Sequence, residues 1–146
     1  MKKLFLLILS IIIVVVLIVL SSHESKPHIV IDGKYFSVDV ARTDLEKQKG
    51  LAIYDELPNE KGMIFPFQKS DYYSFWMKDM KFPIDIIYIN DNKIVDIFKN
   101  VPVPNFQDET LPILRPKSPS SLVLEINAGL SEKYRFKIGD LVKVIY

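Results

Sequence analysis

The chain has 146 residues, 49% of them hydrophobic, which is enough to bury one core but leaves no room for two. Lys and Arg total 19 against 18 for Asp and Glu, so the chain carries no basic field that would hold nucleic acid. Cysteine is absent, which excludes disulfides, thiolate nucleophiles, cysteine zinc sites and a lipidated cysteine.

Residues 1–22 have the pattern of a signal peptide or signal anchor. Lys2 and Lys3 precede an apolar run from Leu4 to Leu20 that only Ser10 interrupts. As a helix this run would reach about 25 Å, which exceeds most signal-peptide apolar regions and is at the short limit for a membrane span. Because an Ala-x-Ala cleavage site is missing, we favour an uncleaved membrane anchor with the domain outside the cytoplasm. Secretion after cleavage of the leader is the alternative.

Residues 23–27 form a polar linker, after which residues 28–146 are expected to fold as a single β-rich domain. Two apolar segments, 28–31 and 35–41, flank Asp32-Gly33. An Asp-Gly pair between two such segments predicts a β-hairpin.

One short helix should follow the hairpin. Thr43 and Glu46 have the spacing of a capping box, and Gly50 can supply the left-handed residue that ends a helix of about two turns. The apolar segment 63–67 then predicts a strand. Because proline lacks a backbone N–H, Pro66 should keep this strand short or place it at a sheet edge.

The segment 84–89 is apolar on both faces, which predicts a strand covered by side chains on each side of the sheet. Turn residues separate it from segment 94–98, which should return antiparallel to it. Further extended segments are expected at 122–126, 134–136 and 141–146. Seven or eight short strands at such spacings predict a mainly β fold, a small antiparallel sandwich or barrel-like domain with one short helix, preceded by the N-terminal apolar helix.

Residues 99–120 contain five of the nine prolines and show no regular apolar period. A segment of this length without regular structure is often a functional flap, while an ordered crossover between sheets is at least as good an interpretation. The role of this proline-rich segment stays open at this point.

Four segments of the chain form an ordered set of motifs. They are Thr43-x-x-Glu46-x-x-x-Gly50-Leu51, Gly62-Met63-Ile64-Phe65-Pro66-Phe67, Phe75-Trp76-Met77-Lys78-Asp79-Met80-x-x-Pro83-Ile84-Asp85-Ile86-Ile87, and Leu124-Glu125-Ile126-Asn127-Ala128-Gly129. Together they resemble the family catalogued as domain of unknown function 192, over most of residues 37–145. The resemblance implies a small β-rich domain, commonly exported behind a leader, with no agreed catalytic activity. The chain departs from the usual family pattern at Lys47, at Ala52 and Tyr54, and at Asp79-Met80.

Three carboxylates, Asp79, Asp85 and Glu125, are candidates for chemistry. Burial at the entrance to an apolar strand disfavours a charge on Asp85 unless Lys78, Lys81 or backbone N–H donors hold it. For Asp85 we favour the structural role, as an acceptor of N–H bonds from the turn just before it. Glu125 is expected on a half-solvated strand face, where a carboxylate is ordinary. Nothing in the sequence shows that the three carboxylates meet as a metal site or an acid-base pair.

Other catalytic patterns are missing from the sequence. It contains no calcium-loop spacing, no histidine cluster, no nucleophile motif and no glycine-rich phosphate loop. We therefore expect no cofactor, no metal and no assigned catalytic residue.

The aromatic segment 72–78 is the most informative candidate surface. Strand-like alternation places Phe75 and Met77 on one side and Trp76 and Lys78 on the other, so one side can pack inward while the other offers a ring and a cation. Such a surface suits sugar rings or protein side chains. The simpler alternative is that Trp76 covers the open end of the core.

The leading hypothesis is a non-enzymatic extracytoplasmic binding module that recognises a cell-envelope polysaccharide or protein and that reaches the membrane through its N-terminal segment. Its candidate ligand-binding residues are Trp76, Lys78, Asp79, Asp85 and Glu125. One alternative is a carboxylate-dependent hydrolase of envelope glycans. Another is a structural or chaperone-like envelope protein whose proline-rich segment docks a partner.

Overall fold

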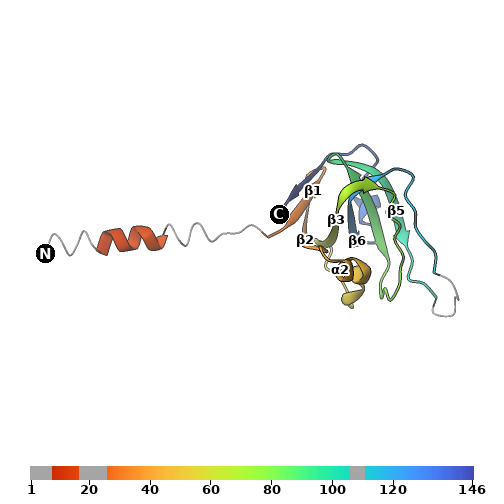
Figure 1. Ribbon diagram of the computed structural model, residues 1–146, viewed down its shortest axis with the longest axis horizontal. Helices are drawn as coiled ribbons and strands as arrows, with labels where there is room; N and C mark the ends of the chain where they lie inside the picture. The colour runs from red at the N-terminus through yellow and green to blue at the C-terminus, as the bar shows by residue number, and fades with distance from the viewer. Residues whose placement is uncertain (1–7, 17–25, 106–110) are drawn as a thin grey trace.

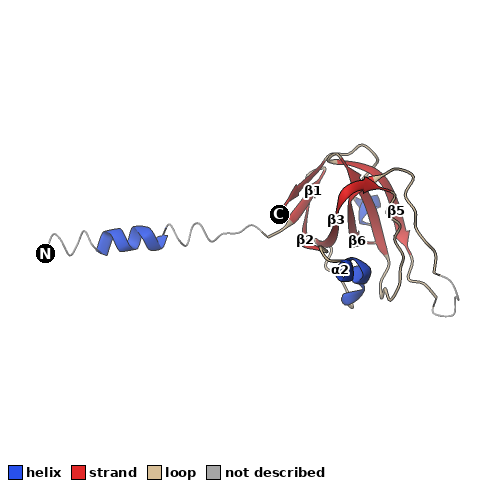
Figure 2. Ribbon diagram, in the orientation of Figure 1, coloured by secondary structure: helices blue, strands red, loops and turns tan. Residues whose placement is uncertain are grey.

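The computed structural model describes residues 8–16, 26–105 and 111–146. Within these ranges, seven strands form one sheet in the order β5-β4-β6-β3-β2-β1-β7, and the sheet curls into a half-barrel (Figure 1). The strands are β1 (His28–Ile31), β2 (Lys34–Val40), β3 (Lys61–Asp71), β4 (Ile84–Asn90), β5 (Lys93–Val101), β6 (Ser120–Asn127) and β7 (Val142–Ile145). Within residues 26–105 and 111–146, the helical elements are α2 (Asp44–Lys49), the 3-10 helix η1 (Gly50–Ile53) and α3 (Leu130–Lys133) (Figure 2).

The mainly β class is confirmed, and of the two expected forms, an antiparallel sandwich or a barrel-like domain, the curled half-barrel is the nearer to the second. One curled sheet takes the place of two stacked sheets, and β2 pairs with β3 in parallel while the neighbouring pairs are antiparallel. A parallel pair cannot be joined by a tight hairpin and needs a crossover. Here α2 and η1 lie in that crossover, and η1 contacts β3.

Both faces of the sheet are covered, as the apolar pattern of β4 predicts. Every residue from Ile84 to Ile89 is buried. Ile87 and Ile89 belong to one apolar cluster, with residues of β1, β2 and β7. Ile84 and Ile86 belong to a second cluster, which includes residues of η1, β3 and the aromatic segment. The two faces therefore have separate cores, and the second core includes Leu51 of η1, which directly follows α2.

At one end the half-barrel closes through backbone hydrogen bonds. The Ile94 N–H donates to the Asp140 carbonyl at 3.0 Å, and the Ile94 carbonyl accepts from Gly139 at 2.8 Å. The Val142 N–H donates to the Asn92 carbonyl at 2.8 Å. Because β5 and β7 are the outermost strands in the sheet order, these bonds join its two edges.

The local signals in the first half of the domain are confirmed. The β1–β2 hairpin turns at Asp32 and Gly33, both with positive φ, as a two-residue primed turn requires. Thr43 and Glu46 form both bonds of the capping box. Gly50 follows α2 with a φ of +51°, a backbone conformation that a side chain would strain.

Two strand predictions were wrong. Strand β3 is eleven residues long and lies between β2 and β6, although it contains Pro66. The proline is tolerated because pairing with β2 ends at Ile64 and the β6 register shifts after Pro66. The expected extended segment 134–136 instead begins at the C-cap of α3 and makes a turn, in which Arg135 has a φ of +59°.

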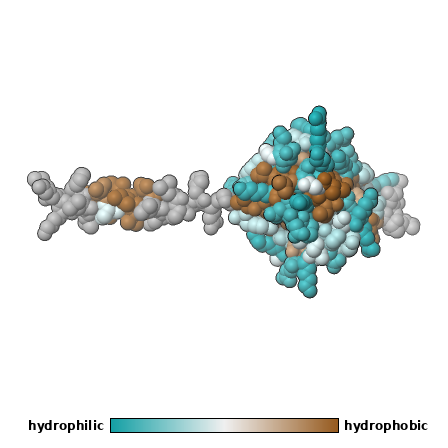
Figure 3. Space-filling view, turned by 90° about the horizontal axis from the view of Figure 1, so that it is seen from above, coloured by the Kyte–Doolittle hydropathy of each residue, from teal (hydrophilic) through white to brown (hydrophobic). Residues whose placement is uncertain are grey.

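The predicted signal segment is described only in part. Residues 8–16 are helical, and most of this stretch is coloured hydrophobic in Figure 3. In the described ranges no helix is long and apolar enough to cross a membrane. The ends of the predicted segment 1–22 and most of the linker 23–27 lie outside the described residues.

The proline-rich segment connects β5 to β6, and its residues 106–110 lie outside the described ranges. Leu114 forms a backbone bridge to Phe75 with hydrogen bonds of 2.9 and 2.8 Å. The Lys117 N–H donates to the buried Asp96 carboxylate at 2.7 Å. Its described part is therefore bound to the domain, and it supports the segment that carries Phe75.

Candidate functional site

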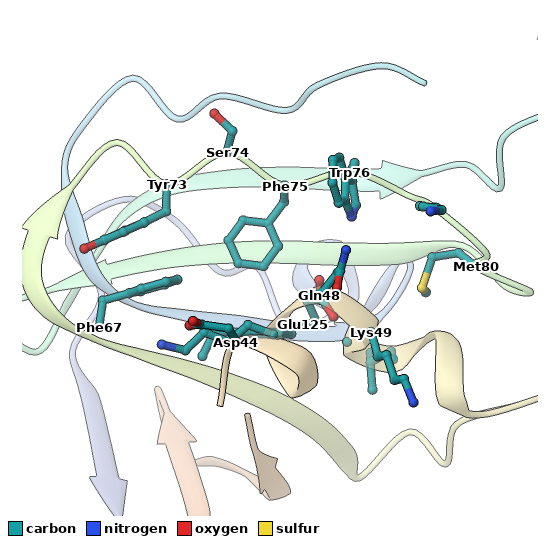
Figure 4. A pocket seen from close by; sticks show the side chains of 15 residues that line it. Asp44, Gln48, Lys49, Phe67, Tyr73, Ser74, Phe75, Trp76, Met80 and Glu125 are labelled. Carbon is teal, nitrogen blue, oxygen red and sulfur yellow. The ribbon is translucent and has the colours of Figure 1, made fainter. Parts of the chain in front are cut away.

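A pocket of about 290 Å³ lies between α2 and the segment 73–80, with β6 behind it (Figure 4). The lining residues are Asp44, Lys47, Gln48 and Lys49 of α2, Gly50 and Leu51 of η1, Phe65 and Phe67 of β3, Tyr73, Ser74, Phe75, Trp76, Lys78 and Met80 of the segment, and Glu125 of β6. We call it the Glu125 pocket. Two wider depressions near β7 contain no buried ionisable side chain.

Glu125 is a buried acid in the wall of this pocket. Its side chain is 4% exposed, and among the described residues Oε2 has no hydrogen-bond partner. Burial raises the pKa of the Glu125 carboxyl to about 8, and a hydrogen bond from the Leu51 backbone opposes the shift. At neutral pH the carboxyl is therefore mostly protonated, and its O–H can donate to a ligand.

The position of Glu125 follows from the sheet. It lies on β6 between Met63 of β3 and Ile86 of β4, so the half-solvated face expected for it is wrong. A central strand covered by the second core has no solvated face at this point. Two glycines border the acid, since a Cβ on Gly50 would lie 3.3 Å from Oε2 and one on Gly62 would lie 2.7 Å from the Glu125 carbonyl.

Aromatic rings form one wall of the pocket. Phe67 and Tyr73 stack with ring centroids 3.5 Å apart and an interplanar angle of 9°, and Phe65 meets Phe75 edge-on at 5.1 Å. Trp76, 46% exposed, extends this wall to the outer rim. Flat apolar surfaces next to a buried hydrogen-bond donor are the usual composition of a small-ligand site.

The structure brings together three of the five predicted site residues. Trp76, Lys78 and Glu125 line the same pocket, whereas Asp79 and Asp85 do not. Asp79 is exposed in a turn with a φ of +58°, which Asp tolerates better than most residues. The three candidate carboxylates are therefore dispersed.

Asp85 has a structural role that the structure shows in full. The side chain is completely buried and accepts backbone N–H bonds from Asn100 at 2.7 Å, Ser131 at 2.7 Å and Gly129 at 3.1 Å. The expected donors in the preceding turn are wrong, because the three N–H groups belong to the last part of β5 and to the chain just after β6. Lys81 pairs with Asp55 at 2.5 Å instead.

The α2 side of the pocket was missed from the sequence. Lys47, Gln48 and Lys49 line it, yet α2 has no buried residue and no apolar stripe that would mark a functional face. The sequence feature that could have marked this side of the pocket was Gly50, directly after the helix. No group of three potential metal ligands occurs in the parts of the chain that the structure describes.

Fold and site together define a small β half-barrel domain with a buried acid in an aromatic pocket. The model of the domain of unknown function 192 family (DUF192), described as Uncharacterized ACR, matches residues 28–144, and the chain belongs to this family. Comparison with curated proteins finds no match.

Two solved structures resemble the domain. A protein of unknown function from Novosphingobium aromaticivorans DSM 12444 is 36% identical, with a TM-score of 0.70 over 80% of this chain and 83% of that one. A putative transcription regulator from Sinorhizobium meliloti 1021 is 24% identical, with a TM-score of 0.70 over 81% of this chain and 91% of that one. At this identity the second likeness concerns the fold alone.

The four motifs that carry the family resemblance converge on the Glu125 pocket. The first contributes Gly50 and Leu51, the second Phe65 and Phe67, the third Phe75, Trp76, Lys78 and Met80, and the fourth Glu125. Segments that are far apart in the chain thus meet at one concave site.

Proposed function

We propose that the protein is a non-enzymatic extracytoplasmic binding module that holds a small ring-bearing group of a cell-envelope component in the Glu125 pocket. The observation that carries this proposal is the convergence of all four family motifs on one pocket with a buried acid, whose Oε2 has no hydrogen-bond partner among the described residues. The N-terminal pattern of Lys2, Lys3 and a long apolar run supports delivery to the membrane.

The chemistry of the pocket favours binding over catalysis. Trp76 and Phe75 offer ring faces, Lys78 a charge at the rim, and Glu125 a hydrogen-bond donor in the wall. These are the elements that orient a ligand by contact and hydrogen bonding.

The test is retention on isolated envelope material from the host cell. Replacing Trp76 and Lys78 together by alanine should abolish retention, while Tyr72→Ala, which removes an aromatic ring that is 52% exposed and outside the pocket, should not. An unchanged melting temperature would show that the double variant is folded. Retention of the double variant at the wild-type level would remove the proposal.

The hydrolase alternative receives less support. Two-carboxylate glycosidases place their carboxyl groups about 5 to 9.5 Å apart across one cleft, but Asp85 is occupied by three backbone donors and Asp79 lies outside the pocket. The structural or chaperone-like alternative would need a partner on the proline-rich segment, and its bridge from Leu114 to Phe75 gives that segment a role within the domain.

A further inference from the structure

Building on the proposed function, we propose that the ligand group is an anionic sugar ring, a hexuronic acid residue. One neutral oxygen of the ring accepts a hydrogen bond from Glu125, and the acid group lies at the rim beside Lys49 and Lys78.

The inner end of the pocket requires a neutral hydrogen-bond acceptor. Glu125 is buried and its Oε2 is unpartnered among the described residues, and the protonated carboxyl donates a hydrogen bond. A charged ligand group at this depth would lose its hydration without an opposite charge to replace it. A hydroxyl or ring oxygen fits this position, and an acid group belongs further out.

The rim is positively charged. Lys49 and Lys78 are exposed, and neither forms a salt bridge within the described ranges. Lys47 also lines the pocket, with its ammonium 4.6 Å from the centre of the Phe67 ring. Since Asp44 is the other ionisable acid in the lining, three cations face one anion in a chain whose net charge is close to zero. This local excess favours an anion at the rim.

Size and polarity favour a sugar over an aromatic acid. A volume of about 290 Å³ is at the low end for ligand pockets and suits a single ring. Gln48 and Ser74 are exposed, line the pocket beside Trp76 and can form hydrogen bonds with ring hydroxyls, which an aromatic acid does not offer.

The first test is calorimetric titration of the full-length protein in detergent at pH 6.5 with glucuronate, glucose and benzoate. Glucuronate should bind at least tenfold more tightly than either of the others. Lys49→Gln with Lys78→Gln should remove this preference, while Lys93→Gln with Lys143→Gln, an equal change of charge outside the pocket, should preserve it. Equal affinity for glucose, tighter binding of benzoate, or no saturable binding of glucuronate would overturn the proposal.

Glu125 gives a second readout. Wild-type affinity for glucuronate should fall severalfold between pH 6.5 and pH 9, because the ionised carboxylate cannot donate and repels the ligand. Glu125→Gln keeps a donor and should bind equally at both pH values, whereas Glu125→Met should lose at least tenfold at pH 6.5. The same fall with pH in Glu125→Gln as in the wild type would contradict the assigned role.

Displacement from envelope material separates this inference from the proposed function. Free glucuronate should release the retained protein at concentrations at which glucose does not. Retention that depends on Trp76 but resists glucuronate would refute the ligand class and leave the binding function standing. Retention that does not depend on the pocket would refute the function, and the titrations would still decide whether the pocket takes an anionic sugar.

Discussion

Glu125→Gln should stabilise the protein at neutral and alkaline pH. The pKa of this carboxyl rises from 4.5 to about 8 on folding, and each pKa unit corresponds to about 1.4 kcal/mol. The folded state therefore keeps a proton that the unfolded state releases above pH 4.5. The contribution of Glu125 to the free energy of unfolding is fully present below that pH. It falls by about 1.4 kcal/mol per pH unit as the pH rises, and it levels off above pH 8 after a loss on the order of 5 kcal/mol. Glutamine has nearly the same shape and no charge, so it avoids this loss.

Urea unfolding of wild type and Glu125→Gln at pH 5, 6, 7 and 8 measures the effect. The difference in unfolding free energy should be small at pH 5 and should grow to about 4 kcal/mol at pH 8. The lowered pKa values of Glu46 and Asp55 act below this range, and the raised pKa of Lys61 acts above it. Parallel stability curves for the two proteins would refute the reasoning, since Glu125 would then ionise at no cost in the folded state.

Three further substitutions test the surroundings of the site. Gly50→Ala should destabilise the protein by about 1–3 kcal/mol from its positive φ alone. The loss should exceed that of Gly33→Ala, because Gly33 also has a positive φ but open space around it. Equal losses in chemical denaturation would show that Glu125 does not crowd position 50. Asp85→Asn should lower the free energy of unfolding by about 3 kcal/mol or more, because an amide cannot replace a carboxylate that accepts from three N–H donors. Asp79→Asn, at an exposed position, should change it by no more than about 0.5 kcal/mol. Similar melting temperatures for these two variants would contradict the structural role of Asp85. Thr43→Ala removes the side-chain cap of α2 and should cost about 1 kcal/mol, with a loss below the error of urea titration arguing against a contribution of the cap to stability.

The parts of the fold that depend on local chemistry were predictable from the sequence. The Asp32-Gly33 turn, the Thr43 capping box and the two apolar faces of β4 each require no knowledge of distant residues, and all three are present. The parallel pairing of β2 with β3 was not predictable, because a short helix between two strands also fits an antiparallel arrangement. The length of β3 was not predictable either. Pro66 is tolerated because pairing with β2 has already ended, and the residues around Pro66 do not show where β2 ends.

The aromatic half of the candidate site was predictable from the sequence, and Glu125 was among the predicted residues, but its burial was not predictable. Trp76 and Lys78 were found because alternation around a single tryptophan is visible locally. Glu125 was underrated because its burial comes from β3 and β4 on either side and from the core above them. An isolated strand pattern cannot show that a polar position has been covered by residues distant in the chain.

The backbone hydrogen bonds that join the two edges of the sheet affect how the domain behaves at high concentration. An open strand edge is a template on which a second chain can add its own strand, and the risk rises when molecules are concentrated. Here the Asn92 carbonyl and the N–H and carbonyl of Ile94 already form hydrogen bonds with residues 139–142 of the same chain, so they are not free to pair with a second chain. Many copies can therefore crowd together at this end without exchanging strands.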